Sequence, residues 1–158
     1  MPTSFWHHPL TAVRAAGFSV GALLLLVGVG VVLRQPLLIP PLAASAALVH
    51  GAPGLPLSQP RNLVGGQLLS ALTGYAVLAV AGPGVWGAAV AGGLALGAML
   101  LARVPHSPAA ATAVIVVMQA PPAVRFVPLL ALATVLLVAI GLLPGRTGQH
   151  PVRYPVRW

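Results

Sequence analysis

The sequence predicts an all-α integral membrane protein, and three observations support this fold class. Of the 158 residues, 58% are hydrophobic and only 5% are charged, whereas about a quarter of the residues in a soluble domain carry charge. The mean hydropathy is +0.98. The apolar residues form segments separated by short turns rich in Pro and Gly. A chain that is apolar on all sides needs an apolar solvent, so we expect one helical bundle, a single integral membrane domain over residues 1–158.

The first half of the chain contains two predicted membrane spans and a short helix between them. Residues 15–33 form the first span, bracketed by Arg14 and Arg34, and this run is too long for the apolar core of a signal peptide. Two prolines open the next segment, residues 39–50. A dozen residues reach about 18 Å, which is well below the roughly 30 Å of a bilayer core. After a Pro-rich loop, residues 62–81 form the second full span.

The second half repeats this order. A Gly-Pro-Gly turn leads into a full span at residues 85–102. A short helix follows at residues 108–119, entered and left through prolines. Residues 126–143 form the last full span, and the basic, aromatic tail at 145–158 is expected at the membrane interface. The sequence therefore predicts four full-length transmembrane helices and two short, Pro-started helices.

The two short segments resemble each other, which predicts an internal repeat. Each has a Pro-rich entry, a small-residue turn with one hydroxyl (Ser45 or Thr112), and an Ala-Pro exit. We expect two three-segment repeats, at about 12–82 and 83–144. If the short segments cross the membrane, the repeats are inverted and six arginines lie inside against two outside; if they re-enter, the count is four against four. The positive-inside rule favours crossing, with both termini cytoplasmic in the inner (plasma) membrane of the cell.

The ionisable residues exclude several functional classes. The chain has no Asp, Glu or Cys, and its formal net charge of +8 comes entirely from arginines. Carboxylate proton relays, Ca²⁺ or Mg²⁺ cages, paired-carboxylate catalysis and thiolate metal sites cannot be built from it. We expect no enzymatic activity, cofactor or metal site. The arginines stand singly at the ends of apolar segments, so nucleic-acid binding is not expected either.

Short, Pro-interrupted segments at matching places in two halves are typical of transport sites. A helix N-terminus leaves backbone N–H groups unpaired and carries a partial positive charge, so two facing N-termini would bind an anion. We expect an anion near mid-membrane between the N-termini of the two short helices. Ser107 is the expected N-cap of the second one, with Pro108 in its first turn. The candidate substrate-binding residues are Ser45, Gln59, Arg61, Asn62, His106, Ser107 and Thr112.

Two of these candidates have plain alternatives at the membrane surface. His106 could donate to an anion or carry a proton, or it could cap a loop near the headgroups. Arg61, with Gln59 and Asn62, forms the other polar cluster within membrane reach. Its alternative is a positive-inside anchor beside turn residues.

The hydroxyl residues also have a structural alternative. Ser45 and Thr112 could hydrogen-bond to carbonyl groups of their own helices. A third polar group, the stripe Gln67, Ser70 and Thr73, lies three residues apart on the predicted helix 62–81 and should face inward. Such a stripe more often joins helices than binds a ligand, so these residues are not among the candidates.

Several motifs resemble the HPP family of integral membrane proteins. Gln59-Pro60-Arg61-Asn62, followed by Gly65-Gly66, resembles its first signature. His106-Ser107-Pro108 resembles the His-Pro-Pro motif that names the family, with Ser107 in place of the middle proline. The resemblance covers roughly residues 15–143. It implies four spanning helices and, because some members are associated with nitrite transport, a small-anion permease.

The sequence thus predicts a passive or proton-linked transporter for a small monovalent anion, with nitrite as first candidate. Its partners would be the anion and the lipid bilayer, and its Gly-rich faces permit a homo-oligomer. Two alternatives stay open. One is a channel for a neutral or water-like solute, in which half-helix ends exclude cations. The other is a structural subunit of a membrane complex that transports nothing.

Overall fold

The computed structural model describes residues 9–146 and 154–156, with the side chains of 144–146 left out. These residues form helices in the order predicted, and no strand occurs among them. The elements are α1 (Pro9–Leu33), α2 (Pro40–Gly51), η2 (Pro56–Ser58), α3 (Pro60–Ala81), α4 (Val85–Leu101), η3 (Ser107–Ala109), α5 (Ala110–Gln119) and α6 (Ala123–Arg146). The predicted all-α fold is therefore confirmed, with η2 and η3 as single 3₁₀ turns in front of α3 and α5.

Three of the described helices, α1, α3 and α6, are long and apolar enough to cross a membrane. The fourth predicted span, α4, has 17 residues, which corresponds to about 25 Å. It is five to eight residues shorter than the other three, which have 22 to 25 residues. The short helices α2 and α5 have 12 and 10 residues, in agreement with the predicted long-short-long order.

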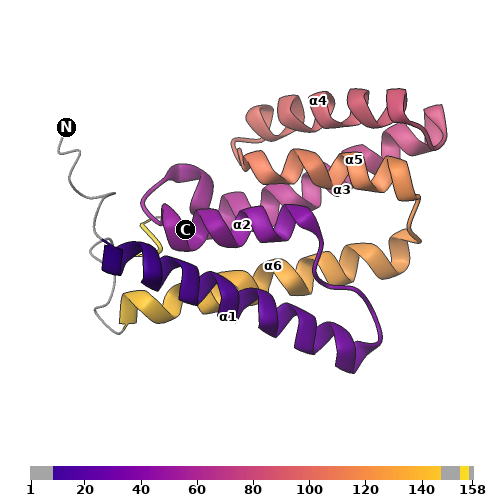
Figure 1. Ribbon diagram of the computed structural model, residues 1–158. Coiled ribbons are helices and arrows are strands. Elements are labelled where there is room, and N and C mark those ends of the chain that lie inside the picture. Colours follow the sequence, from indigo (N-terminus) through magenta and orange to yellow (C-terminus); the bar gives the residue numbers. More distant parts are fainter. Residues whose placement is uncertain (1–8, 147–153, 157–158) are drawn as a thin grey trace.

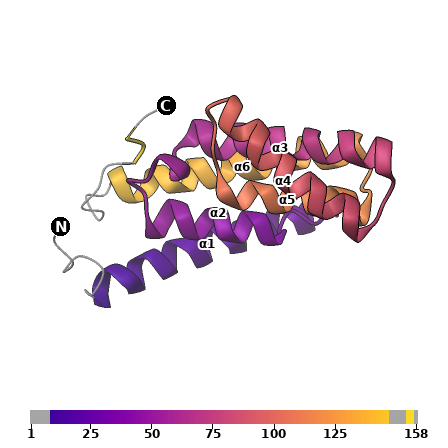
Figure 2. The same cartoon turned by 90° about the horizontal axis from the view of Figure 1, so that it is seen from above.

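Successive helices run in opposite directions along a common long axis (Figures 1 and 2). Helices α1, α3 and α5 begin at one end of the bundle, here called the proximal end, and α2, α4 and α6 begin at the other, the distal end. The short helices α2 and α5 are therefore antiparallel neighbours inside the bundle. Each runs from one end toward the other and does not turn back.

The packing of the helices has a regular pattern. Helix α1 packs on α2, and α4 packs on α5; α2 packs on α6, and α3 packs on α5; α1 packs on α6, and α3 packs on α4. In the two remaining pairs, α2 packs on α5 and α3 packs on α6. If α1, α2 and α3 exchange places with α4, α5 and α6, this set of neighbours is unchanged.

Two glycines show the same pattern at the level of single contacts. A Cβ placed on Gly74 in α3 would lie 2.9 Å from Val116 Cβ in α5, and one on Gly141 in α6 would lie 2.6 Å from Val49 Cγ1 in α2. The two glycines are 67 positions apart, and so are the two valines. Only glycine allows these helices to approach so closely.

The ends of α1 and α4 are also built alike. Arg34 and Arg103 have left-handed backbones, with φ of 54° and 57°. The next residue in each case donates its N–H five residues back, from Gln35 to the Gly30 carbonyl and from Val104 to the Met99 carbonyl, both at 2.9 Å. This is the Schellman helix ending, in which a left-handed residue closes the last turn.

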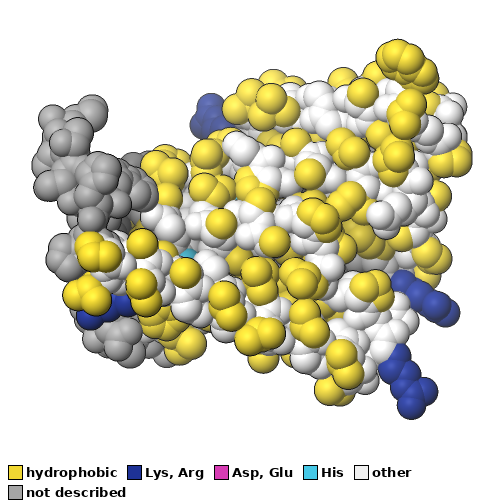
Figure 3. All heavy atoms as spheres, viewed as in Figure 1, with side chains coloured by type: hydrophobic (Ala, Val, Ile, Leu, Met, Phe, Trp, Pro, Cys, Tyr) yellow, Lys and Arg dark blue, Asp and Glu magenta, His cyan; other side chains and the backbone are white. Residues whose placement is uncertain are grey.

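The outer surface has the character expected of a lipid-facing bundle. Hydrophobic side chains cover the face seen in Figure 3, and the dark blue arginines lie only toward its two ends. Long apolar side chains such as Leu24 (64% exposed) and Val90 (55% exposed) point outward. An exposed apolar surface of this extent is stable in hydrocarbon and not in water.

Candidate functional site

The bundle interior contains a connected group of four polar side chains, here called the polar network. Ser45 comes from α2, Gln67 from α3, Thr112 from α5, and His106 from the connection between α4 and η3. Their side chains are fully buried, at 0% exposure. Polar groups buried in a membrane protein are expensive unless they are paired, so this group marks either a packing device or a functional site.

Hydrogen bonds join the four side chains in series. Ser45 Oγ lies 2.7 Å from His106 Nε2 and accepts a hydrogen bond of 3.1 Å from Gln67 Nε2. The Thr112 hydroxyl donates to Gln67 Oε1 at 2.5 Å. The two repeat hydroxyls, Ser45 and Thr112, are thus brought together, but through Gln67 and not directly.

His106 is held from both sides of its ring. Its Nδ1 lies 2.7 Å from the Leu57 carbonyl, which can only accept, so Nδ1 carries a proton. Gly66 leaves room for the residue, because a Cβ there would lie 2.7 Å from His106 Cβ. Burial lowers the pKa of His106 from its ordinary value, and the bond to the Leu57 carbonyl opposes that shift. The ring is therefore neutral at pH 7, with Nε2 as an acceptor.

The polar network lacks one proton that it would need for all of its close contacts to be hydrogen bonds. Ser45 Oγ also lies 2.8 Å from the Pro41 carbonyl. A hydroxyl has one proton, so beside a neutral ring Ser45 can donate to His106 or to Pro41 but not to both. If His106 took up a proton, Nε2 would donate to Ser45, Ser45 would donate to Pro41, and every contact would become a hydrogen bond.

The Gln59 and Asn62 side chains lie outside this network. Gln59 Nε2 donates to the Pro53 and Leu55 carbonyls, both at 2.9 Å, and Asn62 Nδ2 donates to the Pro56 carbonyl at 2.8 Å. These bonds fix the loop between α2 and α3. Their visible effect on the network is indirect, because the same loop presents the Leu57 carbonyl to His106.

Arg61 and Ser107 are exposed, and no hydrogen bond joins either side chain to the polar network. Arg61 is the second residue of α3, at the proximal end. The expected N-cap role of Ser107 is wrong: the cap position of η3 is His106, and no side chain caps it. Ser107 is instead the first residue of this 3₁₀ turn, and it is exposed.

The expected arrangement of the two helix N-termini is also wrong. We predicted that the N-termini of the two short helices would face each other, but α2 begins at the distal end and α5 follows η3 at the proximal end (Figure 1). Ile39, before α2, lies with Pro121, after α5, around one hollow. The positive helix ends therefore lie at opposite ends of the bundle, because the short helices run antiparallel.

Gln67 is the network member that sequence reasoning left out. It was predicted to face inward with Ser70 and Thr73, and the structure confirms this for Gln67 and Ser70, which are buried. Ser70 donates to the Ala109 carbonyl, and Thr73 donates to the Leu69 carbonyl of its own helix. The Gln67 side chain carries its donor and its acceptor on two different atoms, so it can donate to Ser45 and accept from Thr112 at the same time.

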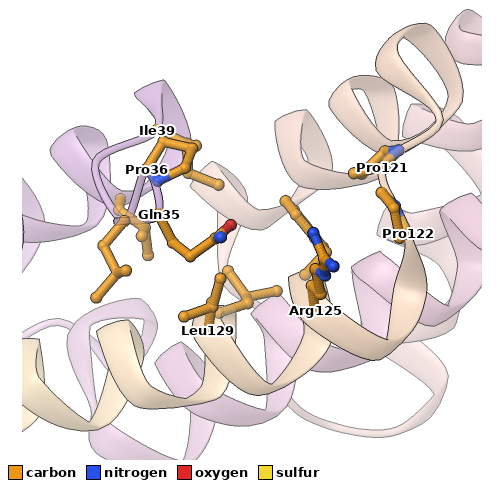
Figure 4. A pocket seen from close by; sticks show the side chains of 11 residues that line it. Gln35, Pro36, Ile39, Pro121, Pro122, Arg125 and Leu129 are labelled. Carbon is orange, nitrogen blue, oxygen red and sulfur yellow. The ribbon is translucent and has the colours of Figure 1, made fainter. Parts of the chain in front are cut away.

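A hollow of about 160 Å³ opens at the distal end, between the α1–α2 connection and the start of α6. Gln35 and Arg125 are its polar lining residues, and the rest of its wall is apolar (Figure 4).

Among the residues that the structure describes, no group of three His, Cys, Asp or Glu side chains could hold a metal ion.

Comparison with known proteins adds three findings. The family model described as HPP, transmembrane region, matches residues 6–155. A curated protein of Dictyostelium discoideum, named only as a transmembrane protein, is 43% identical over 82 residues. That match covers 49% of this chain and 26% of the relative, so the chain matches about a quarter of that longer protein. No solved structure matches the chain.

Proposed function

The chain belongs to the HPP transmembrane family, and on that premise we propose that it is a membrane transporter for a small monovalent anion, with nitrite as the first candidate. The polar network carries this proposal. Ser45, Gln67, His106 and Thr112 are fully buried and hydrogen-bonded to one another. Within a membrane bundle, buried polar groups often line the path of a polar solute.

The chemistry of the polar network suits an anion. Two hydroxyls and the Gln67 amide offer donors that can replace part of an anion's hydration shell, and a protonated His106 would add positive charge. The chain has no Asp or Glu to repel an anion. In the present arrangement these donors bond to acceptors within the polar network. An entering anion would replace those acceptors.

A proton-linked cycle follows from the count of hydrogen bonds. The network has a place for one more proton, at His106 Nε2. A bound anion and a proton on His106 neutralise each other, which lowers the cost of carrying either through a low-dielectric interior. We therefore favour transport of the anion together with a proton.

The proposed membrane arrangement has six crossings and two inverted repeats, at about 12–82 and 83–144, with α4 as the fourth full-length span. The exchangeable helix pairs and the matched Gly74–Val116 and Gly141–Val49 contacts support the repeat. Three crossings in each half would make the repeats inverted.

Charge supports an orientation. Of the arginines whose side chains are described, Arg14, Arg61 and Arg103 lie on the proximal side and Arg34 and Arg125 on the distal side. On the positive-inside rule, the proposed orientation has the proximal end and both termini in the cytoplasm, with the chain in the inner (plasma) membrane of the cell.

A channel for a neutral solute is the second candidate, and one observation favours it. No charged side chain of the described residues belongs to the polar network, and Arg61, which was expected near the anion, is exposed. Neutral donors and acceptors would also suit glycerol or water.

Uptake into liposomes that contain the purified chain tests the proposal. Nitrite, nitrate, chloride, formate and glycerol would be compared, for the natural chain, for Ser45→Ala and for Ser19→Ala as control. Ser19 is a half-buried serine outside the polar network, with one long hydrogen bond of 3.5 Å. We expect saturable anion uptake that Ser45→Ala removes and Ser19→Ala keeps. Uptake of glycerol alone would favour the channel, and no uptake by folded protein would favour a structural subunit.

A further inference from the structure

The hollow at the distal end and the polar network lie along the same side of α2. Leu42 forms part of its wall, and Ser45 follows one turn later on the same side of α2. Leu42 and Leu130, which both line the hollow, are 1% and 3% exposed and are among its most buried lining residues. About one helical turn, or roughly 5 Å, separates the hollow from the Ser45 hydroxyl along α2.

The inner part of the corresponding place at the proximal end is more deeply buried, although its rim is exposed, as at Leu55 (45% exposed). A shift of 67 positions, the spacing of the matched glycine contacts, carries Ile39, Leu42, Phe126 and Leu130 to His106, Ala109, Gln59 and Leu63. These four counterparts are each at most 4% exposed. Ile39 and Phe126, by contrast, are only half-buried beside the hollow. The inner positions of this kind of site are thus partly exposed at the distal end and buried at the proximal end.

Arg125 gives the open end its charge. It is exposed at the start of α6 and lines the hollow, on the side across from Gln35 (Figure 4). The chain contains no acidic side chain that could neutralise it. A fixed cation above an apolar, low-dielectric wall raises the local concentration of small anions.

We propose that this hollow is the outer entrance of the transport route, that the transported anion occupies it beside Arg125, and that the structure is the distal-open, proximal-closed state of an alternating-access carrier. The inference rests on the proposed function and adds to it the entrance, its anion-attracting residue and the carrier mechanism. In the opposite state, the loop that holds His106 would open and the hollow beside Leu42 would close, as inverted repeats exchange their conformations.

The chain has no cysteine, so single cysteines report on the hollow without background. Leu129→Cys lies in the wall of the hollow, and Val124→Cys lies at the same end of α6, 83% exposed and outside the hollow. Both would be labelled in liposomes with an anionic and a cationic methanethiosulfonate reagent. Nitrite at ten times its half-saturating concentration should slow labelling of Leu129→Cys about tenfold, by mass action. It should not change labelling of Val124→Cys.

Arg125→Gln in the Leu129→Cys background tests the charge. We expect labelling by the anionic reagent to slow about fivefold, as removal of one nearby charge predicts, and labelling by the cationic reagent not to slow. In uptake, Arg125→Gln should raise the half-saturating nitrite concentration.

Three results would overturn the inference. If nitrite does not change the labelling of Leu129→Cys, the anion does not occupy the hollow. Protection by anionic phospholipid and not by nitrite would make the hollow a lipid site. Simultaneous labelling of Leu129→Cys and of Leu63→Cys, at the closed end, in the same protein molecule from opposite sides would mean an open channel. If the natural chain takes up nitrite, any of these results leaves the proposed function standing; absence of uptake refutes that function itself.

Discussion

His106 Nε2 lies 2.7 Å from Ser45 Oγ, although 61 positions separate the two residues along the chain. The contact ties the middle of α2 to the connection that leads into η3 and α5. His106 also meets the Leu57 carbonyl in the α2–α3 loop. One imidazole therefore links three segments at the proximal end, and the position of that ring depends on both partners.

Replacing the serine should weaken the fold as well as transport. Ser45→Ala removes a partner of both His106 Nε2 and Gln67 Nε2. Buried groups left unpaired cost about 1–3 kcal/mol each. We expect a lower free energy of unfolding in detergent, measured by denaturant titration with circular dichroism. Ser19→Ala is the control, and an equal loss in both variants would contradict the role of Ser45.

The bridge by Gln67 predicts energetic coupling between two residues that do not touch. In a double-mutant cycle, Ser45→Ala and Thr112→Val should be non-additive by about 0.5–3 kcal/mol, because both act on Gln67. Ser45→Ala with Thr73→Val should be additive, since Thr73 bonds only to its own helix. Strict additivity of the first pair would show that the series of hydrogen bonds does not act as a unit.

The buried histidine predicts a pH dependence of stability. Because burial lowers the pKa of His106 in the folded chain, the unfolded chain binds this proton more readily. Stability should therefore fall as the pH drops below about 6.5, by at most about 1.4 kcal/mol per pH unit for one proton. His106→Gln should lack this part of the slope. A wild-type chain that becomes more stable in acid than His106→Gln would mean that the completed hydrogen bonds outweigh the cost of burying charge.

The two matched glycine contacts predict matched damage. Gly74→Ala and Gly141→Ala would each place a Cβ less than 3 Å from a neighbouring helix. Overpacking of this kind costs about 1–3 kcal/mol. Gly93→Ala, with nothing within 4 Å of its added Cβ, should be neutral or slightly stabilising. Thermal unfolding in detergent distinguishes the three, and damage at only one of the two contacts would argue against an equivalent role in the two halves.

The order of the long and short helices could be predicted from the sequence because each segment is recognisable from its own residues. Length, hydropathy and proline position located all six helices. The bounds differ most at α1, which begins at Pro9 instead of Ala15, and at α6, which spans Ala123–Arg146 instead of 126–143. The repeat of Ser45 and Thr112 likewise rests on local pattern. Both residues do lie in one polar network.

The geometry of the site could not be predicted in the same way. Whether two short helices meet head to head or lie antiparallel depends on packing between distant segments, which hydropathy does not encode. Gln59 and Asn62 carry polar groups that suit a ligand, yet here they bond to the loop backbone. Whether such a side chain binds a ligand or the backbone depends on which carbonyl groups the fold brings within hydrogen-bonding distance.

The two helix endings at Arg34 and Arg103 have a consequence for engineering. The same left-handed turn is closed by arginine on opposite sides of the bundle, so in the proposed topology one of these cations supports the orientation of the chain and the other opposes it. Asparagine also tolerates the left-handed conformation but has no charge. Arg34→Asn would therefore keep the turn and enlarge the charge difference between the two sides, whereas Arg103→Asn would diminish it. Insertion fidelity in cells is thus adjustable at two positions without altering the interior of the protein.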